Sequence, residues 1–332
     1  MPGGNAKQAG SPAWLEPELA TLTRDRFSDP AWIFERKLDG ERCLAYVGGG
    51  GDVRLMSRSQ HQITSTFPEI AEALAAQGRK ECVVDGEIVA FDGNQTRFER
   101  LQQRLGLVRP SADLLAEVPV YYYLFDVLHA DGRDVRPLPL IERKKVLRVV
   151  LKFDDPLRYT EHRDADGEAY YGEACRDGWE GLVAKRADAP YRGGRTRDWL
   201  KFKCENGQEF VIGGFTDPQG SRIGFGALLL GYYDADGQLA YAGKVGTGFD
   251  QKLLRSLHDS MVALERDSPP FDQGKLPRSR VHWVEPRLVG QVVFSEWTRD
   301  GELRHPRFQG LRQDKDPADV VREIPSSAGP AS

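Results

Sequence analysis

A lysine followed by Asp-Gly and an arginine is the first feature of this sequence that could do chemistry. Residues 32–42 read WIFERKLDGER, which places Lys37 two residues before Asp39. A lysine amine is nucleophilic only after it loses its proton, and nearby cations favour that loss because they lower the pKa of the amine. Arg42 stays charged at any pH and suits phosphate recognition. The stretch alone also fits a surface hairpin with ordinary charges, because Asp-Gly favours a tight turn.

Acidic residues interrupt or precede two apolar runs. Residues 82–91, CVVDGEIVAF, form the most apolar strand of the first half of the chain, with Asp-Gly-Glu at its middle. A carboxylate in a buried strand is costly unless it meets a cation, a metal ion or a hydrogen-bonding ligand. Glu87 is therefore a candidate site residue, and a surface turn is the alternative. Glu180 directly precedes a second apolar run, which ends in the cations Lys185 and Arg186.

A basic segment follows at residues 192–203, where five cations stand against one acid and two aromatic residues are included. Period-two alternation over WLKFK puts Lys201 and Lys203 on one face of a strand. Two lysines on one strand face can meet the same phosphate group. A solvated loop with a few arginines is the commoner explanation for any single basic run.

The elements that must position these residues alternate between strands and helices. Apolar alternation and turn residues predict strands at 32–37, 42–47, 53–57, 82–91, 120–128, 182–186 and 199–203. Helical periodicity predicts helices at 68–77, 98–105, 140–151 and 168–176. The first two thirds of the chain therefore reads as antiparallel sheets with flanking helices.

From about Phe210 the pattern changes to strands separated by glycines. Strands are expected at 210–215, 227–233, 239–245, 282–284 and 288–297, and an amphipathic helix from Gln251 to about Glu265, capped by Asp250. Leu253, Leu254, Leu257, Met261 and Leu264 form the expected buried face of that helix. Five strands with one late helix suggest a small Greek-key barrel of the OB type. The glycine-rich segments 220–226 and 243–248 match no phosphate-binding fingerprint and are interpreted as turns and bulges.

Length and composition fit a chain of two domains with α+β architecture. At 332 residues, with 29% charged and 40% hydrophobic residues, each domain can bury its own core. We expect a disordered segment at 1–12, an adenylation (nucleotidyltransferase) domain at 13–205, an OB-fold β-barrel at 206–324 and a disordered tail at 325–332. The net charge of −4 does not itself indicate a nucleic-acid binder.

The sequence also bears on the cellular compartment. No apolar run approaches the roughly 18 residues needed to span a bilayer, and no secretory signal is present. Cys43, Cys82, Cys175 and Cys204 are widely scattered, without histidines at ligand spacing. A zinc site or a disulfide framework is therefore not expected, and we predict a reduced, cytoplasmic protein.

The separate signals form an ordered series that resembles the motifs of the covalent nucleotidyltransferases. That superfamily comprises the ATP-dependent DNA ligases, the RNA ligases and the mRNA capping enzymes. The motif residues are, in chain order, Lys37-Leu38-Asp39-Gly40-Glu41-Arg42, Ser57-Arg58-Ser59, Asp85-Gly86-Glu87, Tyr123-Leu124-Phe125-Asp126, Glu180-Gly181-Leu182-Val183-Ala184-Lys185, Trp199-Leu200-Lys201-Phe202-Lys203 and Arg312-Gln313-Asp314-Lys315.

Further segments at 209–215, 224–232, 241–249 and 304–315 resemble the ligase domain of the bacterial ligase D type, which acts in non-homologous end joining. The resemblance covers residues 13–324 and leaves no room for polymerase or phosphoesterase modules, so we expect a stand-alone ligase or an excised domain. The helical DNA-binding domain at the front of larger ligases is also missing. One departure is Gln60, which stands where many relatives carry a small residue and leaves the path of that loop open.

The resemblance implies a three-step reaction. Lys37 attacks the α-phosphorus of ATP and releases pyrophosphate, which leaves a lysyl-AMP. The AMP passes to the 5′-phosphate of a DNA break, and the adjacent 3′-hydroxyl displaces it and seals the strand. Each step is an in-line displacement at phosphorus, which cations and a divalent metal, Mg²⁺ or Mn²⁺, stabilise.

The same resemblance assigns roles to the motif residues. Lys37, Asp39 and Lys203 are the expected catalytic residues. The residues expected to bind the nucleotide are Glu35, Arg42, Arg58, Glu87, Phe125, Lys185, Lys201 and Lys203. Among them, Phe125 is expected to stack on adenine, and Lys201 and Lys203 to contact the α-phosphate. Glu87 and Glu180 are the expected metal ligands. Arg312, Asp314 and Lys315 are expected to engage the pyrophosphate end of ATP when the OB domain moves over the site.

The expected partner is nicked or broken double-stranded DNA, with a Ku-type end-binding protein and separate polymerase or nuclease modules as further partners. We expect a monomer, associated with the bacterial nucleoid. Two alternatives remain open from the sequence. One is an RNA ligase or a capping guanylyltransferase, and the other is a non-catalytic OB-fold nucleic-acid binder with a decayed site.

Overall fold

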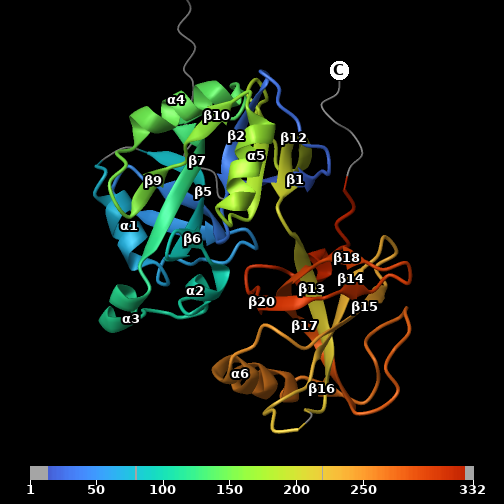
Figure 1. Ribbon diagram of the computed structural model, residues 1–332. Coiled ribbons are helices and arrows are strands. Elements are labelled where there is room, and N and C mark those ends of the chain that lie inside the picture. The colour runs from blue at the N-terminus through green and yellow to red at the C-terminus, as the bar shows by residue number, and fades with distance from the viewer. Residues whose placement is uncertain (1–13, 79–80, 219, 326–332) are drawn as a thin grey trace, which may run out of the picture. The chain divides into compact units, whose positions relative to one another are not determined.

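The computed structural model describes residues 14–78, 81–218 and 220–325, and the chain folds as two compact units. The first unit ends at Cys204, and the second runs from Glu205 to Ile324 (Figure 1). The disorder expected for residues 1–12 and 325–332 concerns, apart from Pro325, residues outside the described ranges. No helix in the described part of the chain is long and apolar enough to cross a membrane.

Two sheets make up most of the first unit. One has the strand order β1 (Glu18–Leu22), β12 (Gly194–Lys203), β11 (Gly181–Arg186), β2 (Trp32–Lys37) and β10 (His162–Asp164). The other has the order β4 (Val53–Ser57), β3 (Glu41–Val47), β5 (Cys82–Asp92), β7 (Val120–Ala130) and β8 (Arg133–Asp134), with β6 (Gln95–Thr96) paired to β5 and β9 (Leu157–Tyr159) to β7. The expected antiparallel arrangement holds except at two pairs, since β1 runs parallel to β12 and β9 to β7.

The Asp-Gly after Lys37 does not close a hairpin. Strands β2 and β3, on either side of it, belong to different sheets, so the chain crosses from one sheet to the other at this point. A Cβ atom on Gly40 would lie only 2.2 Å from the carbonyl oxygen of Ile88. Close approach to β5, rather than a positive φ angle, therefore explains the glycine. Lys37 consequently lies where the two sheets meet.

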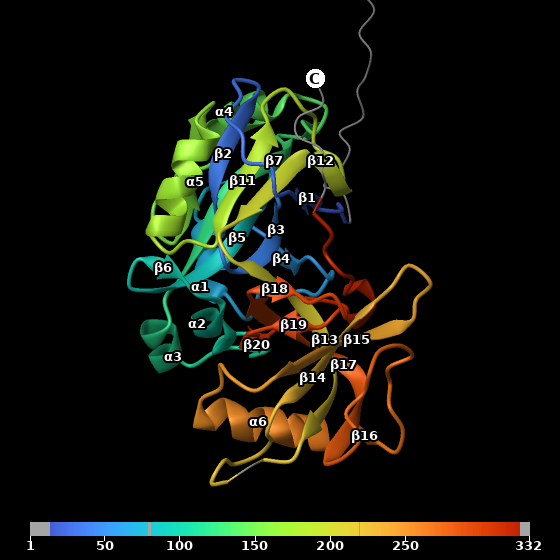
Figure 2. The same ribbon diagram turned by 45° about the vertical axis from the view of Figure 1, so that its right-hand side comes forward.

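Helices lie around the two sheets (Figures 1 and 2). They are α1 (Pro68–Ala75), α2 (Phe98–Gln102), α3 (Ala112–Glu117), α4 (Leu140–Val150) and α5 (Gly167–Arg176). Helices α1 and α4 pack on the β3–β5–β7 sheet, and Tyr170 and Ala174 of α5 pack on Phe34 and Phe202 of the other. Leu44, Val83, Phe125 and Trp199 form a third cluster with side chains from both sheets, so the inner faces contact each other.

Two short helices differ from the sequence prediction. Helix α2 ends at Gln102 rather than at 105. Helix α3 was missed, although Ser111 supplies a cap by accepting a hydrogen bond from the backbone N–H of Leu114. Helix α3 buries no residue, so its sequence lacks the apolar periodicity on which the prediction relied.

The second unit is a curled sheet with a helix packed on its core. The strand order is β15 (Leu239–Val245), β14 (Leu228–Tyr233), β13 (Asn206–Thr216), β17 (Val281–Phe294) and β16 (Glu265–Arg266), with β20 (Arg307–Leu311) also paired to β17. A two-stranded pair, β18 (Glu296–Trp297) and β19 (Leu303–Arg304), and the 3₁₀ turn η1 (Pro317–Asp319) complete it. This arrangement agrees with the expected OB-type barrel.

Strand β17 replaces the two strands expected at 282–284 and 288–297. The register against β13 shifts between Trp283 and Leu288, where Pro286 falls. Proline cannot donate a hydrogen bond to a strand ladder and is tolerated at such a bulge. The interruption read from the sequence is thus a bulge in one strand.

Helix α6 (Gln251–Val262) lies beside β14 within the second unit (Figure 2). The Asp250 carboxylate accepts a hydrogen bond of 2.7 Å from the backbone N–H of Leu253, which confirms the expected cap. Leu254, Leu257 and Met261 are buried in the core of the unit. Leu253 and Leu264 are only partly buried, because the helix ends at Val262 and Leu253 lies at the margin of its apolar face.

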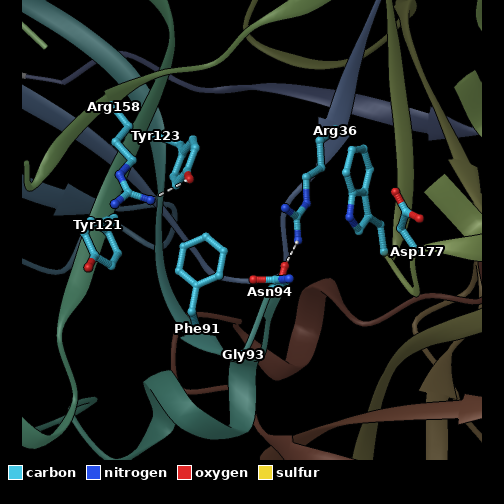
Figure 3. Close-up of a pocket in the computed structure, with 9 residues that line it drawn as sticks. Arg36, Phe91, Gly93, Asn94, Tyr121, Tyr123, Arg158 and Asp177 are labelled. Carbon is cyan, nitrogen blue, oxygen red and sulfur yellow. Dashed lines mark hydrogen bonds between the residues drawn. The ribbon is translucent and has the colours of Figure 1, made fainter. Parts of the chain in front are cut away.

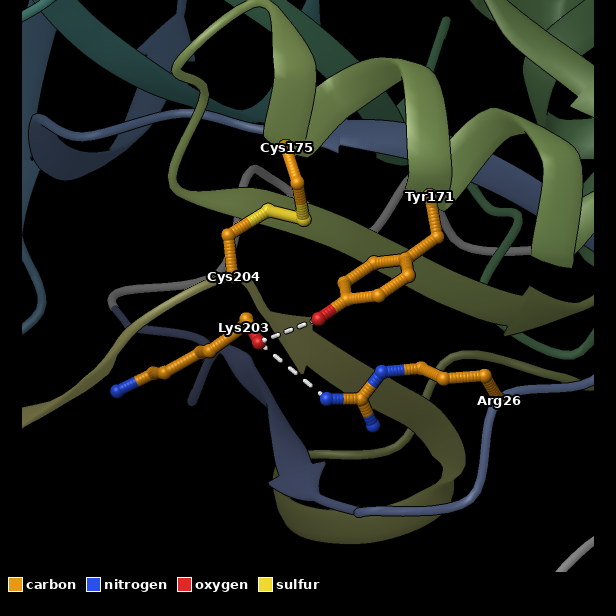
Figure 4. The surroundings of a disulfide bond; sticks show 5 residues. All are labelled: Arg26, Tyr171, Cys175, Lys203 and Cys204. Carbon is orange, nitrogen blue, oxygen red and sulfur yellow. Dashed lines mark hydrogen bonds between the residues drawn. A yellow bond between two sulfur atoms is a disulfide. The ribbon is translucent and has the colours of Figure 1, made fainter. Parts of the chain in front are cut away.

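The expectation of a fully reduced chain was wrong for one cysteine pair. Cys175, in the last turn of α5, is joined by a disulfide to Cys204, which follows β12 (Figure 4). The pair is 29 residues apart in sequence but only 5.4 Å apart between Cα atoms. The Tyr171 hydroxyl also donates a hydrogen bond of 3.0 Å to the carbonyl oxygen of Lys203. Both contacts attach α5 to the end of β12. Cys43 and Cys82 are free and buried.

Candidate active site

Strand register places three predicted lysines and one acid on one face of the first sheet. Gly181 of β11 pairs with Lys37 on one side and with Lys203 on the other. Residues directly opposite in neighbouring strands project on the same side, so the two lysine side chains flank Gly181. In the next row of the same face, Val183 pairs with Glu35 and with Lys201.

Gly181 keeps the space between the two lysines free of a side chain. Its φ angle is 144°, and a Cβ atom there would lie 1.8 Å from the carbonyl oxygen of Phe202. The backbone of β11 therefore passes β12 too closely for any other residue. Gly181 is itself buried, so the two lysines flank a closely packed stretch of backbone, and a phosphate group held by both would meet two cations.

Glu180 is the acid nearest the candidate nucleophile. One of its carboxylate oxygens lies 2.5 Å from Lys37 Nζ, and the two side chains are 27% and 20% exposed. Both groups therefore remain within reach of a ligand. Glu180 was predicted as a metal ligand, and in this structure its carboxylate forms an ion pair with Lys37. Within the described ranges no three acidic, histidine or cysteine side chains cluster as a metal-binding group.

Glu35 lies buried between two lysines. Its carboxylate is 2.6 Å from Lys185 Nζ and accepts a hydrogen bond from Lys144 on α4. Burial alone would raise the pKa of Glu35, but Lys144 and Lys185 outweigh it, so this pKa lies below its ordinary value. Burial, together with the charge of Lys144, lowers the pKa of Lys185. Glu35 and Lys185 thus act here as interior partners.

Sequence reasoning missed Lys144. Its signal was the helix at 140–151, where a lysine and Arg143 occupy the face that packs on β7. Arg143 forms two hydrogen bonds of 2.8 Å with Asp126, and both side chains are fully buried. This pair fixes α4 against β7 and so positions Lys144 beside Glu35.

The second sheet also contributes a row of three side chains, one from each of three neighbouring strands. Arg42, Glu87 and Tyr123 are directly opposite one another on β3, β5 and β7. Arg42 donates two hydrogen bonds, of 2.5 and 2.6 Å, to Asp85. Burial would lower the pKa of Arg42, but the Asp85 carboxylate raises it above its ordinary value. Asp85, which carried no predicted role of its own, is therefore the group that holds this arginine.

Phe125 is 7% exposed and lies under two cations. Lys185 Nζ is 4.0 Å and the Arg42 guanidinium carbon 4.7 Å from the centre of its ring. The ring also meets Trp199 edge-on, at a centroid distance of 5.8 Å. Lys185, Arg42 and Trp199 are thus neighbours of the ring that was predicted to stack on adenine.

Two further predicted residues lie at the margins of this arrangement. The Asp39 carboxylate accepts a hydrogen bond of 3.1 Å from the backbone N–H of Phe98, at the start of α2. Arg58 follows β4, the edge strand of the second sheet. The structure gives Asp39 a visible role in positioning α2. Gln60, two residues beyond Arg58, has a φ angle of 64°, which explains why a small residue suits that position.

The last predicted segment belongs to the second unit. Arg312 donates two hydrogen bonds, of 2.9 and 2.7 Å, to Asp314, directly after β20. The backbone N–H of Arg312 also donates 2.7 Å to the carbonyl oxygen of Val289. Arg312 and Asp314 therefore form a rigid pair anchored to β17, with Lys315 as the next residue.

Both units also match known protein families. Residues 17–203 match the family described as ATP dependent DNA ligase domain, and residues 221–315 match the ATP dependent DNA ligase C terminal region. The multifunctional non-homologous end joining protein LigD of Pseudomonas aeruginosa is 36% identical, over 99% of this chain and 39% of that protein. LigD of Mycobacterium tuberculosis is 36% identical, over 93% of this chain and 40% of that protein.

A solved structure of mycobacterial DNA ligase D, complexed with ATP and MES, is also similar. It shares 36% identity and a TM-score of 0.66, and the match covers 93% of this chain and 98% of that one. The chain spans about 40% of the length of the curated relatives named above. These matches reach both units and confirm the α+β fold of a nucleotidyltransferase domain followed by an OB-fold domain. The chain belongs to the ATP-dependent DNA ligase family.

Proposed function

We propose that this chain seals 5′-phosphate/3′-hydroxyl breaks in DNA through a lysyl-AMP at Lys37. The observation that carries the proposal is the row Lys37, Gly181 and Lys203. A candidate nucleophile and a second cation lie on either side of Gly181, and both would meet the α-phosphate of ATP. Glu180, 2.5 Å from the lysine amine, holds that side chain at the end of β2 before ATP arrives.

In the first step, the Lys37 amine attacks the α-phosphorus of ATP. A P–N bond forms, the bond to the pyrophosphate oxygen breaks, and pyrophosphate leaves. In the second step an oxygen of the DNA 5′-phosphate attacks the same phosphorus and releases the lysine. In the third step the 3′-hydroxyl attacks the 5′-phosphorus, and AMP leaves. Lys201 and Lys203 would stabilise the charge on the α-phosphate in each of the first two steps.

The remaining nucleotide contacts follow from the two rows of side chains. Glu35, Arg42, Arg58, Lys185 and Phe125 would surround the adenosine. Because Lys185 and Arg42 now lie against the Phe125 ring, adenine binding would require these cations to shift. Glu87 would contact the ribose. Asp39, whose carboxylate accepts a hydrogen bond from the backbone N–H of Phe98 in α2, would hold the segment that follows Lys37 in place.

A divalent cation fits the donors available. Glu87 and Glu180 offer hard carboxylate oxygens, and Mg²⁺ is commonly held by one or two carboxylates together with substrate phosphates. Two acids without a full protein cage therefore suit Mg²⁺ or Mn²⁺. When bound, the ion would neutralise phosphate charge. The ion pair of Glu180 with Lys37 would first have to open.

The relatives suggest the biological setting. They are bacterial proteins named for non-homologous end joining. We propose that the chain acts on broken or nicked duplex DNA in that repair process, as a nucleoid-associated cytoplasmic enzyme. A Ku-type end-binding protein and separate polymerase or nuclease modules would be its partners.

A nick-sealing assay tests this function. Wild type is incubated with ATP, Mg²⁺ or Mn²⁺, and a duplex carrying one nick with a 5′-phosphate. We expect sealing by wild type, no sealing by Lys37→Ala, and wild-type sealing by Lys145→Ala, a variant of an exposed lysine on α4. Replacing ATP by GTP, or the nicked DNA strand by RNA, should abolish or strongly reduce sealing. Sealing that requires GTP, or that occurs only on RNA, would contradict the proposal.

A further inference from the structure

A second concave site lies next to the proposed active site, within the first unit (Figure 3). It is a cavity of about 740 Å³, which exceeds the volume of a single nucleotide. Aromatic and arginine side chains dominate its lining. The lining residues used below are Arg36, Phe91, Tyr121, Tyr123, Arg158 and Trp179, and together they are called the aromatic cleft.

The aromatic cleft has a cation and an aromatic ring on each of two walls (Figure 3). On one wall the Arg158 guanidinium lies 3.7 Å from the centre of the Tyr121 ring and donates a 3.0 Å hydrogen bond to the Tyr123 hydroxyl. On the other wall the Arg36 guanidinium lies 4.5 Å from the centre of the Trp179 ring. The Phe91 ring stands between the two walls. Flat π-faces with cations beside them are the groups that bind nucleobases and phosphates.

The two arginines differ in how their charge is balanced. Arg158 is paired with Asp155 at 2.6 Å. Arg36 has no ion pair within 4.0 Å among the residues that the structure describes, and its Nε atom is buried without a hydrogen-bond partner there. Burial lowers the pKa of Arg36. Asp177 also lines the cleft, so Asp155 and Asp177 together match the number of charges on the two arginines, although neither forms an ion pair with Arg36 within 4.0 Å among the described residues. An anionic group would compensate the desolvated guanidinium.

The aromatic cleft is built from chain and strand neighbours of the proposed site residues. Arg36 precedes Lys37, and Trp179 precedes Glu180, the acid paired with that lysine. Tyr123 is directly opposite Glu87 in the sheet. Three cleft residues are thus chain or strand neighbours of three proposed site residues. Successive residues of a strand project to opposite faces, so the side chains of Arg36 and Lys37 point away from each other, whereas Tyr123 shares the face of Glu87. The link between the cleft and the proposed site is therefore the row that contains Glu87 and Tyr123.

We propose that the aromatic cleft binds one unpaired nucleotide at the broken end of the DNA strand, with its base against Tyr121 and Phe91 and its phosphate near Arg36. A base within a duplex has its π-faces covered by its neighbours, whereas an unpaired base offers them to aromatic side chains. The cleft would thereby favour ends that carry an overhanging nucleotide. This inference rests on the proposed function, because it takes the DNA end as the ligand.

Fluorescence binding tests the inference without any chemical step. The probes are a duplex with a one-nucleotide 5′ overhang of 2-aminopurine, a blunt duplex carrying 2-aminopurine in its last pair, and free 2-aminopurine deoxyribonucleoside monophosphate. No ATP is added. We expect wild type to quench the overhanging base and to bind the overhang about tenfold more tightly than the blunt end, as one base stack allows. Tyr121→Leu and Phe91→Leu should each remove that preference.

Controls separate the cleft from folding and from the rest of the DNA surface. The preference is the ratio of two affinities of the same protein, for the overhang and for the blunt duplex. A misfolded variant loses both affinities, whereas a folded variant with a changed cleft residue keeps its affinity for the blunt duplex. Tyr121→Phe keeps a ring and should retain the preference. Arg133→Gln, an exposed arginine at the opposite end of β7, should behave as wild type.

Three results would overturn the inference. They are equal binding of overhang and blunt end by wild type, an undiminished preference in both leucine variants, and binding of the free nucleotide as tightly as the overhang. The last result would make the cleft a site for free nucleotides. Failure of the ligase proposal itself would appear separately, as the absence of nick sealing by wild type.

Discussion

Glu35 shows how much of the site is held by charges in the interior. It is 2% exposed, and Lys144 and Lys185 beside it are equally buried. Breaking a buried ion pair by removing one partner typically costs about 3–5 kcal/mol, because the other charge is left uncompensated. Glu35 therefore serves stability as well as any contact with adenosine.

Glu35→Gln should destabilise the protein by about 3 kcal/mol at neutral pH. The pKa of Glu35 lies below its ordinary value of 4.5, so folding favours the charged carboxylate. That contribution is complete above pH 4.5 and is lost as the pH falls through the lower, folded value. Thermal unfolding of both proteins from pH 7 to pH 3 measures it. The difference in Tm should narrow below pH 4.5, and a constant difference would contradict this assignment.

Gly181 is the second residue whose replacement should be informative. Gly181→Ala places a Cβ atom 1.8 Å from the carbonyl oxygen of Phe202, so β11 and β12 must separate. We expect a loss of at least about 2 kcal/mol in unfolding free energy and a large drop in AMP transfer to Lys37. Gly132→Ala is the matched control, since Gly132 has a φ of 76° with nothing within 4 Å. If both variants lost the same amount of stability and activity, the cause would be backbone strain alone and not the close approach of β11 to β12.

At the scale of elements, the attachment of α5 to β12 stands out. The Cys175–Cys204 disulfide and the Tyr171 hydrogen bond fix the end of the strand that carries Lys203. Strand β12 in turn forms one side of the row in which Gly181 of β11 lies between Lys203 and Lys37. The helix thus supports the position of a proposed catalytic lysine from the outer face of the sheet.

Reduction of this disulfide should lower stability. A cross-link that closes a loop of 29 residues contributes about 3 kcal/mol in the chain-entropy model, within a range of about 0–5. Chemical unfolding of wild type with and without a thiol reductant measures the effect. The double variant Cys175→Ser/Cys204→Ser should match reduced wild type and respond to reductant no further. A further loss in that variant would point to Cys43 or Cys82 instead.

Local sequence patterns predicted individual helices and strands well, but they predicted poorly which strands pair with each other in the sheets. The alternation in β3 and β4 and the cap of α6 are set by nearby residues, so they could be read directly. The assignment of β2 and β3 to different sheets could not, because the pairing depends on residues more than 100 positions away in β11. The disulfide was missed for the same reason.

The candidate site was predictable where its residues lie in recognisable motifs. Lys37, Lys201, Lys203 and Glu35 were identified from spacing and resemblance, and the register brings them onto one face. Lys144 was not identified, since a basic helix is normally solvated and only the buried Arg143–Asp126 pair turns this one inward. Roles that need a bound nucleotide remain proposals.

At the scale of the whole molecule, the proposed chemistry is divided between two units. The nucleophile and its neighbouring cations belong to the first unit, and Arg312, Asp314 and Lys315 to the second. If the latter segment engages pyrophosphate, it matters for the first step only. The later steps act on DNA that already carries AMP.

Arg312→Ala/Lys315→Ala should therefore separate the steps. We expect transfer of AMP to Lys37 to fall about 10²-fold, as for loss of charge-stabilising groups, while a nicked duplex prepared with a 5′-AMP is sealed at nearly the wild-type rate. Arg299→Ala, an exposed arginine in the same unit, is the control and should affect neither assay. Parallel losses on both substrates would contradict a role confined to the first step.

The central claim is that Lys37 carries AMP, and covalent labelling tests it most directly. Wild type and Lys37→Ala, freed of any bound AMP, are incubated with α-³²P-labelled ATP and Mg²⁺ or Mn²⁺ and then denatured. The account predicts a label that survives denaturation of wild type, is released as AMP by acid, and is absent from the variant. No label in wild type, or an equal label in Lys37→Ala, would contradict it.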